Sequence, residues 1–524
     1  MYYENIILGA GPAGLQCGYY FKKHNIPYII LERNPICGSF FEHYPLSGGL
    51  ISINKKYTGS DNPEFNLRHD WNSLINDEGL LFTDYSDDFY PKRKALVKYL
   101  NDFKEKNELN VIFNTPIYKI DKQEDKYILY VKSTNTCFEC KNLIVSTGLS
   151  KMVYPNIQLN VKDKIKHYGE YSRNHFIKKK NLDEFKNKKV LIIGGGNASY
   201  ELANIINEVS SSITILCRKE QKDWALSSHY TGDVRSQYLP FLDTFYLKSL
   251  NAIDYVNVPL DTIINQYETN GEYTINSIDK QYDGLSPYHP FGKIIFCTGW
   301  KFDESIFNFN INLTDNNKYP KIRRNYESEN NKRLFFIGSL MHSLDHKKSS
   351  GGFIHGFRYL IYQFIKINYG IPIPHDIFNI NSDEDIHKFI THIMHRINTS
   401  SAIYQLYGVM GEIFYYNVKE KQVLYYGDVL VDMRNYKFTE DTICFILTLE
   451  YGERKIENIK ELGRRISSLG FENKATLLHP VLKVYNNKNI VDLVHFDEDL
   501  YANFTNQDMY YDKLYRTFKS YILY

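Results

Sequence analysis

The sequence has 524 residues, and its 63 lysines and arginines against 61 aspartates and glutamates give a formal net charge of +2. Because this length exceeds what one hydrophobic core supports, two or three domains are expected. The near balance of charge argues against general electrostatic binding of nucleic acid or of an acidic membrane surface, so small molecules are the expected partners.

The first predicted element is a strand at residues 3–8, close to the start of the sequence. No basic stretch, apolar core and small-residue cleavage site precede it as in a secretory signal, and no apolar run is long enough to cross a bilayer. The seven cysteines are scattered and odd in number, which suits a reducing compartment better than a disulfide framework. We therefore expect a cytoplasmic protein without a membrane contact.

A glycine fingerprint follows this strand, with Gly9, Gly11 and Gly14 in the pattern G-x-G-x-x-G. Such glycines let the chain turn sharply off a strand, let backbone N–H groups approach a pyrophosphate, and let the helix pack close to the sheet. The next strand, at 28–31, ends on Glu32, at the spacing of an acid that holds a ribose hydroxyl. The surrounding strand, helix and acid favour a dinucleotide site over an ordinary glycine turn.

A second fingerprint has Gly194 and Gly196, with Ser199 in the third place. The strand after it, at 213–217, ends on Arg218 rather than on an acid. A cation there suits the 2′-phosphate of NADPH, which an acid would repel, and a solvated surface charge is the alternative for this arginine. We therefore assign FAD to the first unit and NADPH to the second.

Further glycines later in the chain complete the expected cofactor sites. Gly351 and Gly352 open a late helix, where unpaired N–H groups can meet the anionic edge of a reduced flavin, although a plain glycine turn explains them equally well. The residues expected to bind FAD are Gly9, Gly11, Pro12, Ala13, Gly14, Glu32, Arg33, Thr147, Gly148, Gly338, Gly351 and Gly352. Those expected to bind NADPH are Gly194, Gly196, Asn197, Ala198, Ser199, Arg218 and Lys219.

Strand and helix patterns alternate up to about residue 220, which predicts parallel sheets with covering helices. Between the fingerprints lies an excursion at residues 40–92, rich in Asp, Tyr and Asn. Short buried strands at 293–299 and 333–339 end at glycine, and there the chain returns to its first domain. From residue 376 the character changes to polar helices, a tyrosine-rich stretch, and strands near 423–432 and 482–494.

These patterns predict an α/β fold with two Rossmann-like dinucleotide-binding domains, the NADPH domain being inserted in the FAD domain, plus a C-terminal α+β appendage. The expected boundaries are 1–155 and 300–375 for the FAD-binding domain, 156–299 for the NADPH-binding domain and 376–524 for the appendage.

The two fingerprints, with Thr147-Gly148 and residues 297–299 closing the strands that lead out of each domain, resemble the flavin-containing monooxygenase branch of two-domain flavoproteins. Three longer stretches, 50–57, 64–74 and 349–359, more closely resemble the FAD-dependent oxidoreductase domain-containing proteins of the endoplasmic reticulum lumen. The resemblance covers about residues 1–410 and implies an FAD-dependent oxidoreductase.

The resemblance also suggests single functional residues. Asn54, in a Leu-x-x-x-Asn-Lys context, matches the asparagine that in the monooxygenases sits over the flavin and supports its oxygenated form, so it is the expected catalytic residue. The monooxygenase signature between the domains is matched only in part by His167 and Tyr171, since the preceding Phe-x-Gly is missing. For His69, Asp70, Trp71 and His355, a structural role in a packed loop or core is at least as good an interpretation as a substrate contact.

The cysteines bear on where the electrons go. Disulfide reductases of this architecture need a redox pair facing the flavin, yet Cys37 has no partner nearby and no cysteine lies between Gly148 and Val190. Cys137 and Cys140 form a C-x-x-C, but in a predicted hairpin away from either expected place, and a metal site would need further ligands. We predict neither a dithiol relay nor a metal site.

Without a relay, reduced flavin passes its electrons to O₂ or directly to a substrate. The leading hypothesis is an NADPH-dependent FAD monooxygenase that oxygenates a nucleophilic nitrogen or sulfur of a small molecule, for example as an N-hydroxylase of an amine or amino acid. The alternatives are a flavin-dependent reductase or oxidase that passes electrons to a protein or small acceptor, and a non-catalytic flavin-binding interaction module. Gly194, Gly196 and Arg218 argue against the module, and a homo-oligomer is left open.

Overall fold

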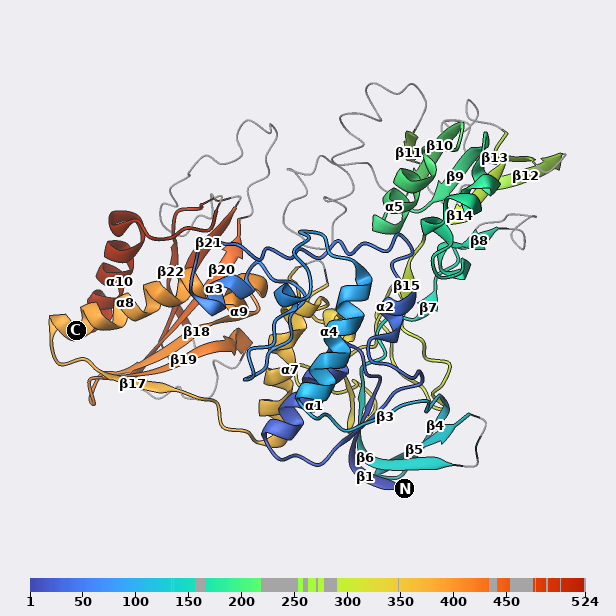
Figure 1. Ribbon diagram of the computed structural model, residues 1–524. Helices are drawn as coiled ribbons and strands as arrows, with labels where there is room; N and C mark the ends of the chain where they lie inside the picture. The colour runs from blue at the N-terminus through green and yellow to red at the C-terminus, as the bar shows by residue number, and fades with distance from the viewer. Residues whose placement is uncertain are drawn as a thin grey trace.

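The computed structural model describes residues 1–132, 134, 136–155, 165–217, 253–257, 263–269, 272–277, 290–346, 348–432, 441–452, 475, 477–486, 489–499 and 501–522. Three larger sheets organise these residues, together with two small strand pairs (Figure 1). Arg218 and Lys219, predicted to bind NADPH, lie outside the described residues.

The first sheet has the strand order β3-β2-β1-β6-β5-β4, and β16 also pairs with β6. Its strands are β1 (Tyr2–Leu8), β2 (Ile29–Leu31), β3 (Val111–Ile112), β4 (Ile117–Gln123), β5 (Lys126–Val131), β6 (Cys137–Val145) and β16 (Leu334–Phe336). The pairs of β1, β2, β3, β6 and β16 are parallel, whereas β4, β5 and β6 form an antiparallel meander. β16 joins β6 after the whole second sheet, as the predicted return of the chain requires.

Three helices belong to this first unit: α1 (Pro12–Lys23), α4 (Arg93–Lys106) and α7 (Ile354–Tyr369). Fully buried residues such as Phe21, Phe103 and Phe364 belong to one continuous core that these helices share. The excursion between β2 and α4 carries the short helices α2 (Ser39–His43) and α3 (Pro63–Leu67) and a 3₁₀ turn at Phe82–Asp84.

The second sheet is parallel in all its pairs, in the order β11-β10-β9-β14-β8. Its strands are β8 (Lys166–His167), β9 (Lys189–Ile193), β10 (Ser212–Cys217), β11 (Ile253–Asn257) and β14 (Lys293–Phe296), and α5 (Asn197–Ile206) follows β9. β12 (Ile263–Thr269) and β13 (Glu272–Ser277) form a separate hairpin. β7 (Lys151–Met152) and β15 (Trp300–Lys301) pair where the chain leaves and re-enters the first unit.

The third sheet is antiparallel throughout, in the order β17-β19-β18-β20-β21-β22. Its strands are β17 (Asp376–Asn379), β18 (Met410–Asn417), β19 (Gln422–Leu430), β20 (Thr442–Tyr451), β21 (Leu478–Asn486) and β22 (Asn489–His495). The helices α8 (Asp383–Thr399), α9 (Ser401–Gln405) and α10 (Asp512–Ile522) accompany it. The predicted strands at 423–432 and 482–494 correspond to β19 and to β21 with β22.

The second and third sheets lie on opposite sides of the first unit (Figure 1). Two fully buried arginines fix the excursion, one to the third-sheet region and one to α7. Arg68 donates to the carbonyl oxygens of Ile397 and Ser400, at 2.8 and 3.0 Å. Arg358, on α7, donates to the carbonyls of residues 67, 70 and 73. Because these acceptors are backbone atoms, both guanidiniums hold backbone segments in place and do not neutralise a carboxylate.

None of the helices that the structure describes combines the length and the apolar character needed to cross a bilayer.

Candidate functional site

A cavity of 960 Å³ is lined by both glycine loops and by all three sheet regions. The first unit contributes Gly11, Pro12, Ala13, Ser146, Thr147, Gly148, Leu149, Ser339, Gly352, Phe353, Ile354, His355 and Phe357. The excursion contributes Phe40, Phe41, Tyr44, Pro45, Leu50, Ile51, Ser52, Ile53, Trp71 and Tyr90. The second-sheet region and its connections contribute Tyr168, Asn197, Ala198, Glu201, Gly299, Trp300 and Lys318, and the third-sheet region Tyr404, Gln405, Tyr407, Tyr451 and Leu478.

The first glycine loop has the geometry of a pyrophosphate cradle. Gly9 has a φ of +108°, and a Cβ atom at Gly14 would lie 2.0 Å from the carbonyl oxygen of Gly9. A Cβ at Gly11, in contrast, would meet no protein atom within 4 Å. Gly11 is also the N-cap of α1 and offers no side chain to the first-turn N–H groups. Open space beside uncapped N–H groups suits an anionic phosphate, so the loop fits FAD.

Glu32 lies directly after β2, with a buried side chain. Its Oε2 accepts from the backbone N–H of Ala10 at 2.9 Å, and its Oε1 from that of Asn34 at 3.0 Å. The carboxylate is thereby held against the glycine loop, where the ribose acid was predicted. Arg33, the next residue, is exposed and is not among the cavity-lining residues.

The later glycines of the predicted FAD site also meet at this loop. Thr147 and Gly148 line the cavity, and Gly148 has a φ of +67°. Gly338 has a φ of +72°, and a Cβ there would lie 2.4 Å from the Cβ of Ala13, so the chain after β16 lies directly against the start of α1.

The second glycine loop repeats the first in outline. Gly194 has a φ of +126°, and its Cβ would lie 2.4 Å from the carbonyl oxygen of Cys297. A Cβ at Gly196 would meet nothing within 4 Å, and Asn197 and Ala198 line the cavity. Ser199 is buried in the third place. The open side of this loop fits a second dinucleotide.

The N-terminus of α7 contributes a third set of backbone N–H groups. Phe353 is the N-cap and supplies no side-chain cap, and Gly352, Phe353 and Ile354 line the cavity. A Cβ at Gly352 would lie 2.3 Å from His342, and Gly351 donates its N–H to Asp345 at 2.8 Å. Gly352 therefore faces the cavity, whereas Gly351 is engaged behind it.

Asn54, the predicted catalytic residue, does not line the cavity. Its side-chain amide is buried and donates to the carbonyl oxygens of Ser86 and Asp88, at 2.7 and 3.2 Å, which holds the excursion together. His167 is likewise buried and caps a 3₁₀ turn by accepting from the N–H of Gly169. In this structure both side chains therefore have packing roles.

Glu201 is a cavity residue that the sequence reasoning missed. It lies on α5 with only 8% of its surface exposed, and the Ser47 hydroxyl donates to its Oε2 at 3.1 Å. Burial raises the pKa of this carboxyl to about 7, although hydrogen bonds from Ser47 and Tyr168 act in the opposite direction. An acid five residues after Gly196, one helical turn after Asn197, was the available sequence signal.

The excursion and α7 meet at a stacked pair of rings. Trp71 and His355 lie 4.4 Å apart between centroids at 29°, and both line the cavity. Asp70 instead accepts from the N–H groups of Asn72 and Ser73 at 3.0 and 2.9 Å, which confirms the structural interpretation of this residue. His69 is not a cavity-lining residue.

All seven cysteines lie in the described part of the chain, no disulfide joins any two of them, and none lines the cavity. Cys137 and Cys140 are three residues apart on β6 and therefore point to opposite faces of the sheet. Burial raises the pKa of the Cys37 thiol to about 12. Among the described residues, no group of three His, Cys, Asp or Glu side chains could hold a metal ion.

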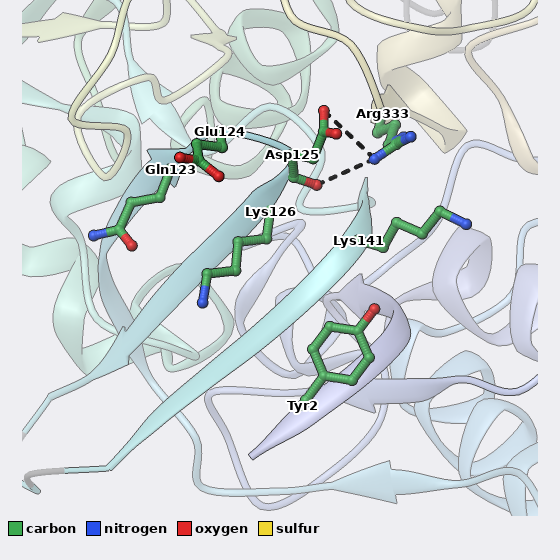
Figure 2. Close-up of a pocket in the computed structure, with 7 residues that line it drawn as sticks. All are labelled: Tyr2, Gln123, Glu124, Asp125, Lys126, Lys141 and Arg333. Carbon is green, nitrogen blue, oxygen red and sulfur yellow. Dashed lines mark hydrogen bonds and ion pairs between the residues drawn. The ribbon is translucent and has the colours of Figure 1, made fainter.

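A second hollow, of 730 Å³, lies at the β4–β5 turn and is lined by Tyr2, Gln123, Glu124, Asp125, Lys126, Lys141 and Arg333. Figure 2 shows the Arg333 guanidinium reaching Asp125 across it, with an N···O separation of 3.6 Å. Lys126 also pairs with Glu139 at 2.7 Å. None of its residues belongs to a glycine loop, so this hollow is a charged surface dip and not a second cofactor site.

Comparisons with known proteins agree with the geometry of the cavity. The model of the family described as pyridine nucleotide-disulphide oxidoreductase matches residues 6–338. The FAD-dependent oxidoreductase domain-containing protein 2 of Mus musculus is 32% identical over 521 residues, which cover 91% of this chain and 75% of that protein. Its namesake in Danio rerio is 30% identical over 536 residues, covering 92% and 76%.

Among solved structures, a variant of the flavin monooxygenase from Stenotrophomonas maltophilia is similar with a TM-score of 0.52 and 16% identity. The similarity covers 70% of this chain and 99% of that chain. At this identity it shows a shared fold and nothing more.

Proposed function

Because this chain belongs to the pyridine nucleotide-disulphide oxidoreductase family and is an FAD-dependent oxidoreductase, we propose that it is an NADPH-dependent monooxygenase, which transfers one oxygen atom of O₂ to a nucleophilic nitrogen or sulfur of a small molecule. The observation that carries the proposal is the cavity itself. Both glycine loops line it, aromatic and aliphatic side chains form most of its remaining wall, and it contains no cysteine.

The positions of the thiols limit which group can accept the electrons of the reduced flavin. A dithiol relay requires sulfur next to the flavin, and here all seven cysteines lie elsewhere. In the proposed reaction NADPH supplies two electrons as a hydride, and one oxygen atom of O₂ enters the substrate. The other oxygen atom leaves as water, whose two hydrogens are that hydride's hydrogen and one further proton. Aromatic and aliphatic walls favour this outcome because they keep bulk water from the reacting atoms.

In this assignment the backbone does most of the cofactor binding. The N–H groups at Gly11 would hold the FAD pyrophosphate, Glu32 would hold the ribose, and the N-terminus of α7 at Gly352 would stabilise negative charge on the reduced ring system. Bound FAD supplies the hydride acceptor and the oxygen chemistry. The loop at Gly194 and Gly196 holds the nicotinamide cofactor, and Arg218 with Lys219 selects NADPH.

The corresponding domain assignment is an NADPH-binding domain at 156–299, inserted in an FAD-binding domain at 1–155 and 300–375, with 376–524 as the appendage. We assign the enzyme to the cytoplasm, with O₂ and a small molecule as its partners. Seven cysteines without a disulfide among them support a reducing compartment.

Glu201 is the group that can hold the further proton. Its carboxyl lines the cavity, and burial brings its pKa to about 7, so both protonation states are accessible near neutral pH. The Ser47 hydroxyl, at 3.1 Å, fixes the orientation of the carboxyl.

The test uses FAD-loaded protein, NADPH and ¹⁸O₂ with a panel of amines and thioethers. We expect one ¹⁸O atom in the product for each NADPH oxidised. Hydrogen peroxide in place of an oxygenated product across the whole panel would indicate an oxidase, and NADPH-dependent reduction of an added acceptor without O₂ would indicate a reductase. If NADPH does not bleach the flavin, the nicotinamide assignment is wrong.

A further inference from the structure

One part of the cavity is built mostly from residues beyond the family model, which ends at residue 338. We call it the aromatic pocket and define it by Trp71, His355, Tyr404, Gln405, Tyr407 and Tyr451. Its members are contiguous: the carbonyl oxygen of Arg68 accepts from both Trp71 Nε1, at 3.2 Å, and Gln405 Nε2, at 2.5 Å. Tyr407 and Tyr451 meet edge to face at 4.9 Å.

His355 is the polar centre of the aromatic pocket. Its side chain is 2% exposed, and the ring lies between Trp71, at 4.4 Å, and Phe353, which is parallel at 5.6 Å. Its Nε2 has no hydrogen-bond partner among the residues that the structure describes. A buried polar atom without a partner costs about 1–3 kcal/mol, so a ligand that completes the hydrogen bond is favoured.

The protonation state of His355 determines which kind of group it can bind. Burial and the Arg358 guanidinium both lower the pKa of His355 well below its usual range, so the ring is neutral. The hydrogen bond with the backbone of Trp71 raises the pKa of His355, which is the effect expected when a ring N–H donates to a carbonyl oxygen. With the other nitrogen carrying the proton, Nε2 is an acceptor.

The surroundings also determine the charge of the ligand. None of the side chains that define the aromatic pocket is charged, and Arg358 gives the pocket a positive potential that disfavours an ammonium group. A carboxylate would lack a charged partner in the wall, because neither Arg358 nor Arg68 lines the cavity and both donate to backbone carbonyls behind it. The flat faces of Trp71 and the tyrosines suit a planar molecule.

We infer that the aromatic pocket is the substrate subsite, and that its ligand is an uncharged aromatic molecule whose N–H or O–H group donates to His355 Nε2, as an aromatic amine can. This inference rests on the proposed function for its link to oxygenation. The inference favours aromatic amines over the aliphatic amines and amino acids that the sequence left open. An aliphatic amine or an amino acid carries a charge that this pocket does not neutralise.

Binding is tested by calorimetry on the FAD-loaded protein without NADPH, so that the readout does not depend on turnover. The probes are 4-methylaniline, para-xylene, which has the same shape without the donor, and cyclohexylammonium. We expect 4-methylaniline to bind about tenfold or more tightly than para-xylene, as one hydrogen bond of about 1.4 kcal/mol predicts. Cyclohexylammonium should bind most weakly.

The matched variants are His355→Phe, which keeps an aromatic plane and removes Nε2, and His69→Phe, which alters a neighbouring histidine outside the cavity. His355→Phe should bring 4-methylaniline down to the affinity of para-xylene, and His69→Phe should leave both affinities unchanged. An unchanged 4-methylaniline affinity in His355→Phe overturns the inference. If His355→Phe loses its FAD, the order of the three probe affinities on the wild-type protein still tests the inference. Tighter binding of cyclohexylammonium than of 4-methylaniline overturns the inference.

The two proposals fail in different ways. If 4-methylaniline binds as expected but no ¹⁸O enters any product, the pocket stands and the monooxygenase assignment fails. If aliphatic amines are oxygenated while the aromatic amine does not bind, the monooxygenase stands and the pocket assignment fails.

Discussion

The two glycine loops share one backbone design but differ at their third position. In both, the first glycine has a positive φ and the second is open to the cavity side. In the third place Gly14 has no room for a Cβ, whereas Ser199 is accommodated. The tighter helix–strand packing is thus needed in the first unit alone, and the shared elements, the turn and the open glycine, are those that a dinucleotide itself requires.

The same alignment pairs Gln16 on α1 with Glu201 on α5, because each lies five residues after the open glycine. Gln16 is buried and exchanges two hydrogen bonds with the backbone of Ile75, at 2.7 and 3.0 Å. Glu201 instead meets the Ser47 side chain at the cavity wall. Both residues secure the excursion, but only the second places a titratable group at the cavity wall.

Gly14→Ala should have the largest effect. Its Cβ would lie 2.0 Å from a backbone oxygen that cannot move without opening the loop, so we expect at least about 3 kcal/mol of destabilisation and loss of bound FAD. The ratio of flavin to protein absorbance and the Tm measure both. Ser199→Ala, which keeps its Cβ, should cost no more than about 1.5 kcal/mol. A Gly14→Ala protein with full FAD content would show that the two loops tolerate a Cβ atom at the third position equally well.

Glu201→Gln should flatten the dependence of stability on pH. Because the folded protein raises the pKa of Glu201 from 4.5 to about 7, its stabilising effect is complete below pH 4.5 and is lost as the pH rises through 7. The loss is at most about 3 kcal/mol. The wild-type Tm should therefore fall further between pH 5 and pH 8 than the Tm of the variant.

Gln16→Glu provides the matched test, since it places an acid at the buried position of α1 and should add a pH dependence of the same sign. If the Tm falls equally steeply with pH in the wild-type protein and in Glu201→Gln, the assigned pKa of Glu201 is contradicted.

Gly11→Ala and Gly196→Ala should separate the two cofactors. Neither Cβ meets a protein atom within 4 Å, so the Tm of the cofactor-free protein should not change. Each methyl group occupies space assigned to a pyrophosphate. We expect a Kd for FAD about tenfold or more higher in Gly11→Ala, and a KM for NADPH higher by a similar factor in Gly196→Ala with FAD content unchanged. If either variant affects both cofactors alike, the loops do not serve separate nucleotides.

Arg218→Ala should have the smallest effect, confined to one nucleotide. Removal of a cation assigned to the 2′-phosphate is expected to lower kcat/KM for NADPH about tenfold and to leave that for NADH nearly unchanged. Steady-state kinetics with both nucleotides measure the ratio. Equal losses with NADPH and NADH would argue for a general structural role of Arg218.

Much of the cofactor framework could be predicted from the sequence, because glycine spacing and short apolar strands are local signals. Gly9, Gly194 and Gly338 have the positive φ that turns of this kind require, and Glu32 accepts a hydrogen bond from the first glycine loop. The return of β16 to β6 was also readable, since a buried strand that ends at glycine signals the edge of a parallel sheet.

The substrate side of the cavity could not be predicted, because it depends on contacts between segments far apart in the sequence. Nothing local in Tyr404 or Tyr451 indicates that they approach Trp71. Asn54 shows the opposite problem. Its spacing matched a family pattern, but the cavity-lining run 50–53 ends one residue before it, and its amide donates to the carbonyl oxygens of Ser86 and Asp88.

The pairing of β16 with β6 sets the order in which a ribosome can complete this protein. The first glycine loop emerges early, but its sheet lacks one strand until residue 336 has been made, after the whole second sheet has passed through the exit tunnel. The aromatic pocket needs Tyr451, which comes later still. A nascent chain can therefore acquire its nucleotide cradles well before it can enclose a substrate, so a protein released too early would expose its flavin to solvent.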